Sequence, residues 1–227
     1  MVAPALIYCA GGNPAFRRVA TDCGWLNGAR LPDTVYNPPL YFADQDWKKP
    51  DKTAYMMALQ RHRPVMATVL DLEEGLFRAT MDWAEEAAQW CRSVVIIPKV
   101  PGTIDDIPEI IGGAAVVLGY SVPTKYGGTC VPVWEFGRRP VHLLGGSPQK
   151  QLDLCRYLNV VSLDGNMAHL QAHRCRFWSR KKGSRGHWVQ LSEAGDRREE
   201  DANLEAIRRS LVGIKEAWQS RLTAQMP

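Results

Sequence analysis

The sequence predicts a single α/β domain folded as a compact (β/α)8 barrel of the TIM type. Segments with the pattern of buried strands alternate with helical segments almost throughout the 227 residues, and repeated βα units form parallel sheets with right-handed crossovers. Seven or eight such units favour a closed barrel over an open sheet, and no G-x-G-x-x-G signature follows the first strand. No linker-like tract divides the chain, so residues 1–227 are expected to form one domain.

Seven short apolar segments have the pattern of buried strands, and an eighth has it more weakly. The seven are expected at residues 4–9, 40–43, 65–70, 94–97, 115–118, 141–144 and 159–163, and the weaker one at 188–191. Helices are expected at residues 14–23, 52–61, 73–91, 105–111, 148–158 and 201–221. The helix at 148–158 has a clear start, because Ser147 suits the N-cap and Pro148 the first helical position.

The composition is that of an ordinary soluble globular protein, with 45% hydrophobic and 23% charged residues. No apolar run approaches the roughly 20 residues that cross a bilayer, and the N-terminus lacks the basic region of a signal peptide. The six cysteines are scattered and form no C-x-x-C pair, which indicates reduced thiols. We therefore expect a cytoplasmic protein without membrane partners.

A basic segment at residues 174–188, RCRFWSRKKGSRGHW, carries much of the net charge of +4. It is expected to be a loop that binds a phosphate backbone, with bases stacked on its aromatic side chains. The candidate nucleic-acid-binding residues are Arg174, Arg176, Arg180, Lys181, Lys182 and Arg185. The alternative is a solvated basic loop whose Phe177 and Trp178 pack inward.

Polar residues and glycines follow the expected strands at equivalent places, and the carboxyl ends of barrel strands gather at one face. These residues are Asn13, Asp44, Asp71, Lys99, Ser121, Gly145, Gly146, Ser147 and Asp164. Carboxylates brought together in a cleft push their pKa values apart, which supplies one nucleophile and one proton carrier for cleaving a glycosidic bond. Each aspartate taken singly could instead be a helix N-cap or a turn residue.

The chain resembles a short member of the tRNA-guanine transglycosylase superfamily, and within it the phage and bacterial relatives that insert 7-deazaguanine bases into DNA. The resemblance covers residues 6–218 and rests on CAGGNPAF, FADQDW, MATVLDLEEG, MDWAEEAA, IPKVPG, LGYSVPTKYGGT, VHLLGGSP and VVSLDGNM. It implies that Asp164 is the nucleophile, that Asp44 carries the proton, with Asp46 as a competitor, and that Asp71 reads the base. Asn13, Lys99, Ser121, Gly145 and Gly146 are the further candidate substrate-binding residues.

The implied reaction exchanges guanine in DNA for a 7-deazaguanine derivative such as preQ0, through a covalent aspartyl intermediate. The implied partners are DNA and the incoming base, with no cofactor, and the protein acts as a monomer or a homodimer in a bacterial cell, encoded by a phage or by the host. The tRNA enzymes carry a zinc subdomain with closely spaced cysteines, and no such spacing occurs here, which favours DNA over tRNA. His169, His173 and Cys175 lie close in sequence but lack a fourth ligand, so we expect no metal.

Three alternatives remain open from the sequence. The same carboxylates suit a hydrolase that excises the base with water. A non-catalytic nucleic-acid-binding barrel, the partner of an active subunit, needs only the basic segment. A metabolic enzyme with this barrel would bind a phosphate group at Gly145 and Gly146. This alternative gives the basic segment no role.

Overall fold

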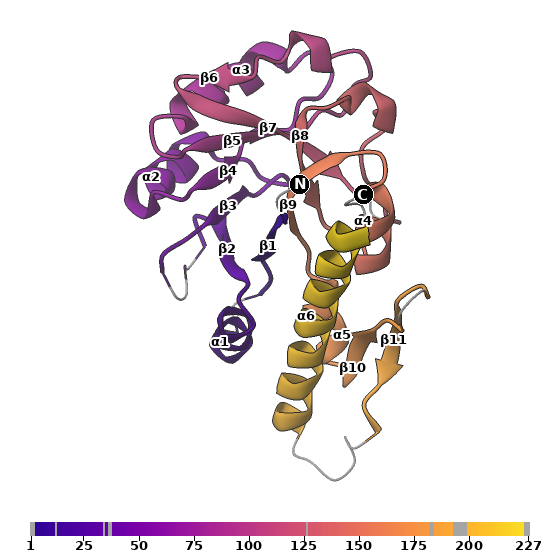
Figure 1. Cartoon of the computed structure of the whole chain (residues 1–227). Coiled ribbons are helices and arrows are strands. Elements are labelled where there is room, and N and C mark those ends of the chain that lie inside the picture. Colours follow the sequence, from indigo (N-terminus) through magenta and orange to yellow (C-terminus); the bar gives the residue numbers. More distant parts are fainter. Residues whose placement is uncertain are drawn as a thin grey trace.

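Eight parallel strands close into a barrel ringed by helices in the computed structural model, which describes residues 3–11, 13–33, 35, 38–125, 127–181, 184–192 and 199–224 (Figure 1). The barrel strands are β1 (Ala5–Tyr8), β2 (Leu26–Leu31), β3 (Phe42–Gln45), β4 (Met66–Thr68), β5 (Ser93–Ile96), β7 (Ala114–Ser121), β8 (Pro140–Leu144) and β9 (Asn159–Asp164). They pair in chain order, β5 pairs with β7, and β9 pairs with β1 to close the barrel. The predicted fold class is confirmed.

Helices cover the outside of this barrel. They are α1 (Pro14–Asp22), α2 (Lys52–His62), α3 (Phe77–Ala87), α4 (Pro148–Leu154), α5 (Met167–Ala172) and α6 (Glu199–Ala224), with short 3-10 turns η1 (Ile104–Asp106) and η2 (Val133–Phe136) after β5 and β7. The long α6 packs against α1 and α5 and covers the seam where the last strand meets the first (Figure 1). None of the described helices is long and apolar enough to cross a membrane.

The eighth barrel strand is not the segment that the sequence indicated. Residues 188–191 lie mostly in β11 (His187–Gln190), which pairs antiparallel with β10 (Arg176–Ser179) outside the barrel. The missing strand is β2, whose sequence LNGARL has no apolar run. Its Gly28 lies where a Cβ atom would come within 2.8 Å of Ile7, so tight packing of β2 on β1 excludes a larger side chain.

Other elements differ in extent from the prediction. Residues 105–111 are not a helix: they contain the end of η1 and the short strand β6 (Ile110–Ile111), which pairs antiparallel with the start of β7. The helix expected at 73–91 is shortened to α3, because Gly75 has a φ of +75°, outside the helical region. The C-terminal helix begins at Glu199 instead of 201 and extends to Ala224, and α5 was not expected.

The barrel interior is filled by apolar side chains that point inward from alternate positions of the strands. This inner cluster consists of Ile7, Phe42, Met66, Val95, Ile97 and Val117. A second, larger cluster packs the outer faces of the strands against the helices. This cluster fills the barrel interior. The polar groups that follow it along the strands therefore lie at the barrel mouth.

Candidate active site

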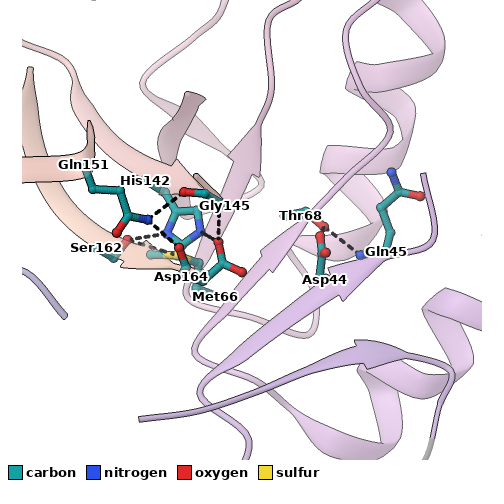
Figure 2. A network of polar contacts seen from close by, with 9 residues as sticks. All are labelled: Asp44, Gln45, Met66, Thr68, His142, Gly145, Gln151, Ser162 and Asp164. Atoms are coloured by element: carbon teal, nitrogen blue, oxygen red, sulfur yellow. Dashed lines mark hydrogen bonds and ion pairs between the residues drawn. The ribbon is translucent and has the colours of Figure 1, made fainter. Parts of the chain in front are cut away.

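Asp164 is the last residue of β9, and its carboxylate is nearly buried. The backbone N–H of Gly145 donates to its Oδ1 at 3.2 Å, from the turn that follows β8. The imidazole Nε2 of His142 lies 3.6 Å from the same oxygen (Figure 2). The neighbouring strand β8 and the turn that follows it therefore fix the position of this carboxylate.

His142 is fully buried inside the barrel, on β8. Its Nδ1 lies 2.8 Å from the hydroxyl oxygen of Ser162, while Nε2 has no hydrogen-bond partner among the described residues. A proton on Nε2 would point toward Asp164, and the Ser162 hydroxyl would then donate to Nδ1 in place of the sulfur of Met66, which lies 3.7 Å from the hydroxyl oxygen. His142 can thus orient the carboxylate of Asp164 from the barrel interior. The sequence placed His142 only within the turn motif and assigned it no role.

Gln151 of α4 binds both strand ends beneath Asp164. Its Nε2 donates to the carbonyl of Gly145 at 2.7 Å and to the carbonyl of Asp164 at 2.6 Å (Figure 2). Gly145 and Gly146 have φ values of +65° and +80°, which glycine adopts without strain. A Cβ on Gly145 would meet no atom within 4 Å, whereas one on Gly146 would lie 2.5 Å from Val122. The turn is thus packed on one side and open on the other.

Asp44 lies near the end of β3 and retains partial exposure. The hydroxyl of Thr68 donates to its Oδ1 at 3.0 Å, and that hydroxyl accepts from the backbone N–H of Gln45 (Figure 2). Burial, followed by the charge of Asp164, raises the pKa of Asp44 to about 7, and the hydrogen bond from Thr68 opposes this shift. Near neutral pH this carboxyl can therefore hold or release a proton.

Cys9 directly follows β1, and the charges of Asp44 and Asp164 both act on its thiol. Burial raises the pKa of its thiol well above the usual value, with the charges of Asp164 and Asp44 adding to the shift. The thiol is therefore neutral at physiological pH, and its side chain packs against the inner apolar cluster. It was not identified from the sequence, although it directly follows the apolar segment LIY.

Asp71 and Lys99 form an ion pair at the ends of neighbouring strands, with 3.3 Å between Lys99 Nζ and Asp71 Oδ2. Burial raises the pKa of Asp71, and Lys99 acts in the opposite direction. The charge of Asp71 also contributes to the raised pKa of Asp44, which puts Asp71 on the same side of the barrel. Its Oδ1 is buried and has no hydrogen-bond partner within the described chain, so a ligand donor could use it.

Asn13 and Ser121 do not join this cluster through any side-chain contact in the part of the chain that is described. The side-chain oxygen of Asn13 caps α1, accepting from the N–H groups of Ala15 and Phe16 at 2.9 and 3.3 Å. Ser121 ends β7, and its carbonyl accepts from the N–H of Thr129. The side-chain oxygen of Asn13 is thus occupied as a helix N-cap, a role that the sequence indicated only for the aspartates.

Asp46 occupies a different environment from Asp44. Its Oδ2 lies 3.9 Å from Arg30, and its Oδ1 accepts from the N–H of Lys48. Arg30 lies on β2 in register with Asp44, and its charge lowers the pKa of the Cys9 thiol against the larger effect of burial. Arg30 thus belongs to the rim of the mouth, and the sequence missed it because it missed β2.

The basic segment 174–188 is a hairpin, not an open loop. Arg174, Arg176, Lys181 and Arg185 are exposed and Arg180 is half-buried, while Lys182 lies outside the described residues. Trp178 is buried in the core, and Phe177 lies beneath Arg209, so neither ring is free to stack on a base. Arg185 pairs with Asp153 of α4 at 2.8 Å, which holds the hairpin tip against the flank of the barrel.

His169 and His173, the histidines considered above as possible metal ligands, pack against aromatic rings. His169 and His173 lie 4.8 Å apart between ring centroids, each next to Phe16, and His169 Nδ1 is 2.9 Å from the hydroxyl of Tyr8. Burial lowers the pKa of His169. Among the residues described, no three histidine, cysteine or acidic side chains are arranged to hold a metal ion.

Residues 20–219 match the model of a protein family described as a family of unknown function (DUF6610). No curated protein matches the chain. The match covers every barrel strand except β1, together with Asp44, Asp71 and Asp164.

Proposed function

We propose that this chain, which belongs to the family of unknown function DUF6610, is a glycosyltransferase that exchanges guanine in DNA for a 7-deazaguanine derivative. One observation carries the proposal: Asp44 and Asp164 face the same barrel mouth, and the pKa of Asp44 lies at about 7. A partly protonated carboxyl, acting with a second carboxylate that is held by an N–H donor, would provide the acid and the nucleophile of a retaining reaction.

In the first half of the proposed reaction, Asp164 attacks C1′ of the deoxyribose. A bond forms between its carboxylate oxygen and C1′, and the bond from C1′ to N9 of guanine breaks with its electron pair going to the base. Asp44 gives its proton to the departing guanine, which avoids release of an anion. The target nucleotide must leave the base stack to reach a barrel mouth, so single-stranded or flipped-out substrate is expected.

In the second half, the incoming 7-deazaguanine occupies the same place. Asp44 takes the proton from its N9, N9 attacks C1′, and the bond to Asp164 breaks. The contacts of Asp164 with Gly145 and His142 favour its return as a carboxylate leaving group.

Asp71 is proposed to select a guanine-like base. Its unpartnered Oδ1 can accept from the N1 and N2 hydrogens of guanine, which adenine does not present in that arrangement. The ion pair with Lys99 favours the ionised carboxylate and opposes the effect of burial on the pKa of Asp71. The N–H of Gly145 already donates to Asp164, so the N–H groups of Gly146 and Ser121 are the proposed donors to the exocyclic oxygen. The basic hairpin is proposed to contact DNA phosphates.

The test is incubation of the protein with DNA and labelled guanine. Incorporation of label supports transfer, and abasic sites without incorporation would instead support the hydrolase. Asp164→Asn is expected to abolish incorporation while DNA binding persists, and unchanged incorporation in that variant overturns the proposal. Asp44→Asn should lose incorporation and Asp46→Asn should retain it, which separates the two candidate acids.

A further inference from the structure

A cavity of about 380 Å³ lies on the flank of the barrel, between α4, the tip of the β10–β11 hairpin and the C-terminal part of α6. Its lining residues are Gln149, Asp153, Arg156, Tyr157, Arg180, Ser184, Arg185 and Arg221. None of them contributes to the carboxylate cluster at the mouth. The volume is within the range of about 300–1,000 Å³ that is common for small-molecule sites.

The cavity has a strong excess of positive charge. It is lined by four arginines and one aspartate, and the aspartate, Asp153, already pairs with Arg185. Within the described residues, no carboxylate lies within ion-pair distance of Arg156, Arg180 or Arg221. Guanidinium groups gathered without counter-charges repel one another, and an anion that bridges them relieves this cost.

Arg180 and Arg185 are held in place before any ligand binds. The Nε of Arg180 donates to the carbonyl of Ser184 at 2.9 Å, which orients its guanidinium group. The N–H of Gly186 donates to the side chain of Gln149 at 2.7 Å, and this bond fastens the hairpin to α4. The guanidinium group of Arg221 contacts the thiol of Cys155, but its buried Nε has no hydrogen-bond partner among the described residues. Such an unsatisfied buried donor is expected where a ligand completes the site.

We propose that this cavity binds the phosphate group of a nucleotide. Arginine is suited to phosphate because its planar fork of donors contacts two phosphate oxygens at once. The ring of Tyr157 is 68% exposed beside the cavity, and it offers a face on which the base of the same nucleotide stacks. The nucleotide is a unit of a polynucleotide or a free nucleoside phosphate, and both present the same chemistry to the site. The inference does not depend on base exchange at the mouth.

The experiment measures binding of three probes at constant ionic strength: inorganic phosphate, guanosine 5′-monophosphate and a single-stranded oligodeoxynucleotide. Arg156→Gln and Arg180→Gln are each expected to weaken binding of the nucleotide probes by about tenfold, the usual effect of losing a hydrogen bond to a charged group. Arg78→Gln, on the exposed surface of α3, is the matched control and should leave binding unchanged. Tyr157→Ala should weaken the two nucleotide probes and leave inorganic phosphate unaffected.

Tighter binding of the oligonucleotide identifies a polynucleotide as the ligand, and tighter binding of the monophosphate identifies a free nucleotide. The proposal is overturned if neither nucleotide probe binds, if only inorganic phosphate binds, or if the two arginine variants bind both nucleotide probes like the wild type. Arg156 is exposed, so its substitution is not expected to unfold the protein. Repeating the titration with the Asp164→Asn variant separates the two proposals. Nucleotide binding in the cavity should persist in this variant, whereas base exchange at the mouth should be lost.

Discussion

At the scale of single residues, the decisive feature is the environment of Asp44. An aspartate on the protein surface is ionised at neutral pH, but burial and the charge of Asp164 raise the pKa of Asp44 from 3.8 to about 7. The unfolded chain provides neither effect. The folded state therefore binds a proton at this residue more tightly than the unfolded state does, and stability must depend on pH.

This linkage gives a prediction for Asp44→Asn. Because the folded pKa is raised, the stabilisation from protonated Asp44 is fully present below about pH 4 and is lost as pH rises through about 7. At pH 8 the variant should be more stable than the wild type by roughly 2–4 kcal/mol, and the advantage should shrink at pH 5. Urea denaturation across this range measures it. Asp46→Asn, a change of a nearby carboxylate, is the matched control, and parallel curves for wild type and Asp44→Asn would contradict the assignment.

At the scale of elements, α4 joins the two strand ends that carry the site. Gln151 satisfies the carbonyl groups of both Gly145 and Asp164, so the position of the nucleophile depends on one side chain of a neighbouring helix. The opposite side of α4 presents Gln149 and Asp153 to the hairpin. A short helix thus connects the mouth with the arginine-lined cavity.

Replacing Gln151 should affect both stability and activity. Gln151→Leu leaves two buried carbonyl groups with fewer donors, which is expected to lower the free energy of unfolding by about 1–3 kcal/mol. The proposed base exchange should fall further than the loss of folded protein explains, because the Asp164 backbone is no longer held. Thermal unfolding and single-turnover incorporation measure the two effects. Gln60→Leu, an exposed change on α2, is the control, and equal behaviour of the two variants would count against the role of Gln151.

A buried arginine on α1 links the segment after β1 to strand β2. Arg17 of α1 donates to the carbonyl of Gly11 at 2.9 Å and to the carbonyl of Gly28 at 2.7 Å. Arg17→Met should therefore destabilise the protein by about 2–4 kcal/mol, since it leaves the buried carbonyl of Gly28 and the partly buried carbonyl of Gly11 without their donor. Arg18→Met changes the adjacent, exposed arginine and should have little effect. Urea denaturation of the two variants compares them directly.

At the scale of the whole molecule, closure of the barrel is achieved by packing and hydrogen bonds. The indole Nε1 of Trp25 donates to the carbonyl of Leu211, and Lys215 donates to the carbonyl of Cys23, so α6 is bound to the region before β2. All six cysteines are free. Stability therefore rests on the noncovalent core and on these long-range contacts.

The free cysteines lead to a prediction about reducing agents. The midpoint of thermal unfolding should be the same with and without dithiothreitol, because no disulfide restrains the unfolded chain. Tryptophan fluorescence and far-UV circular dichroism should report one common transition, as expected for a single cooperative barrel. A midpoint that falls on reduction would show that a disulfide forms in solution.

The sequence allowed the barrel and most of its strands to be predicted, because an apolar run bounded by turns is a local pattern. It could not reveal β2, whose LNGARL lacks that pattern and becomes a strand by pairing with β1 and β3. Nor could it place residues 188–191, which are apolar enough for a barrel strand but pair with β10 instead. Strand pairing is decided by the partners that the rest of the chain offers, and a short segment does not encode them.

The sequence by itself determined the (β/α)8 class and the set of strand-end residues from which the site is built, since the period of burial and the turn after each strand are written locally. Only the tertiary structure decided how those residues combine. It paired Asp71 with Lys99, and it used the side chain of Asn13 as a helix cap. It gave Asp46 a different partner from Asp44, namely Arg30. It also added His142 and Gln151 around Asp164. The physical reason is that distances between strand ends, and the burial that shifts a pKa, exist only after the barrel has closed.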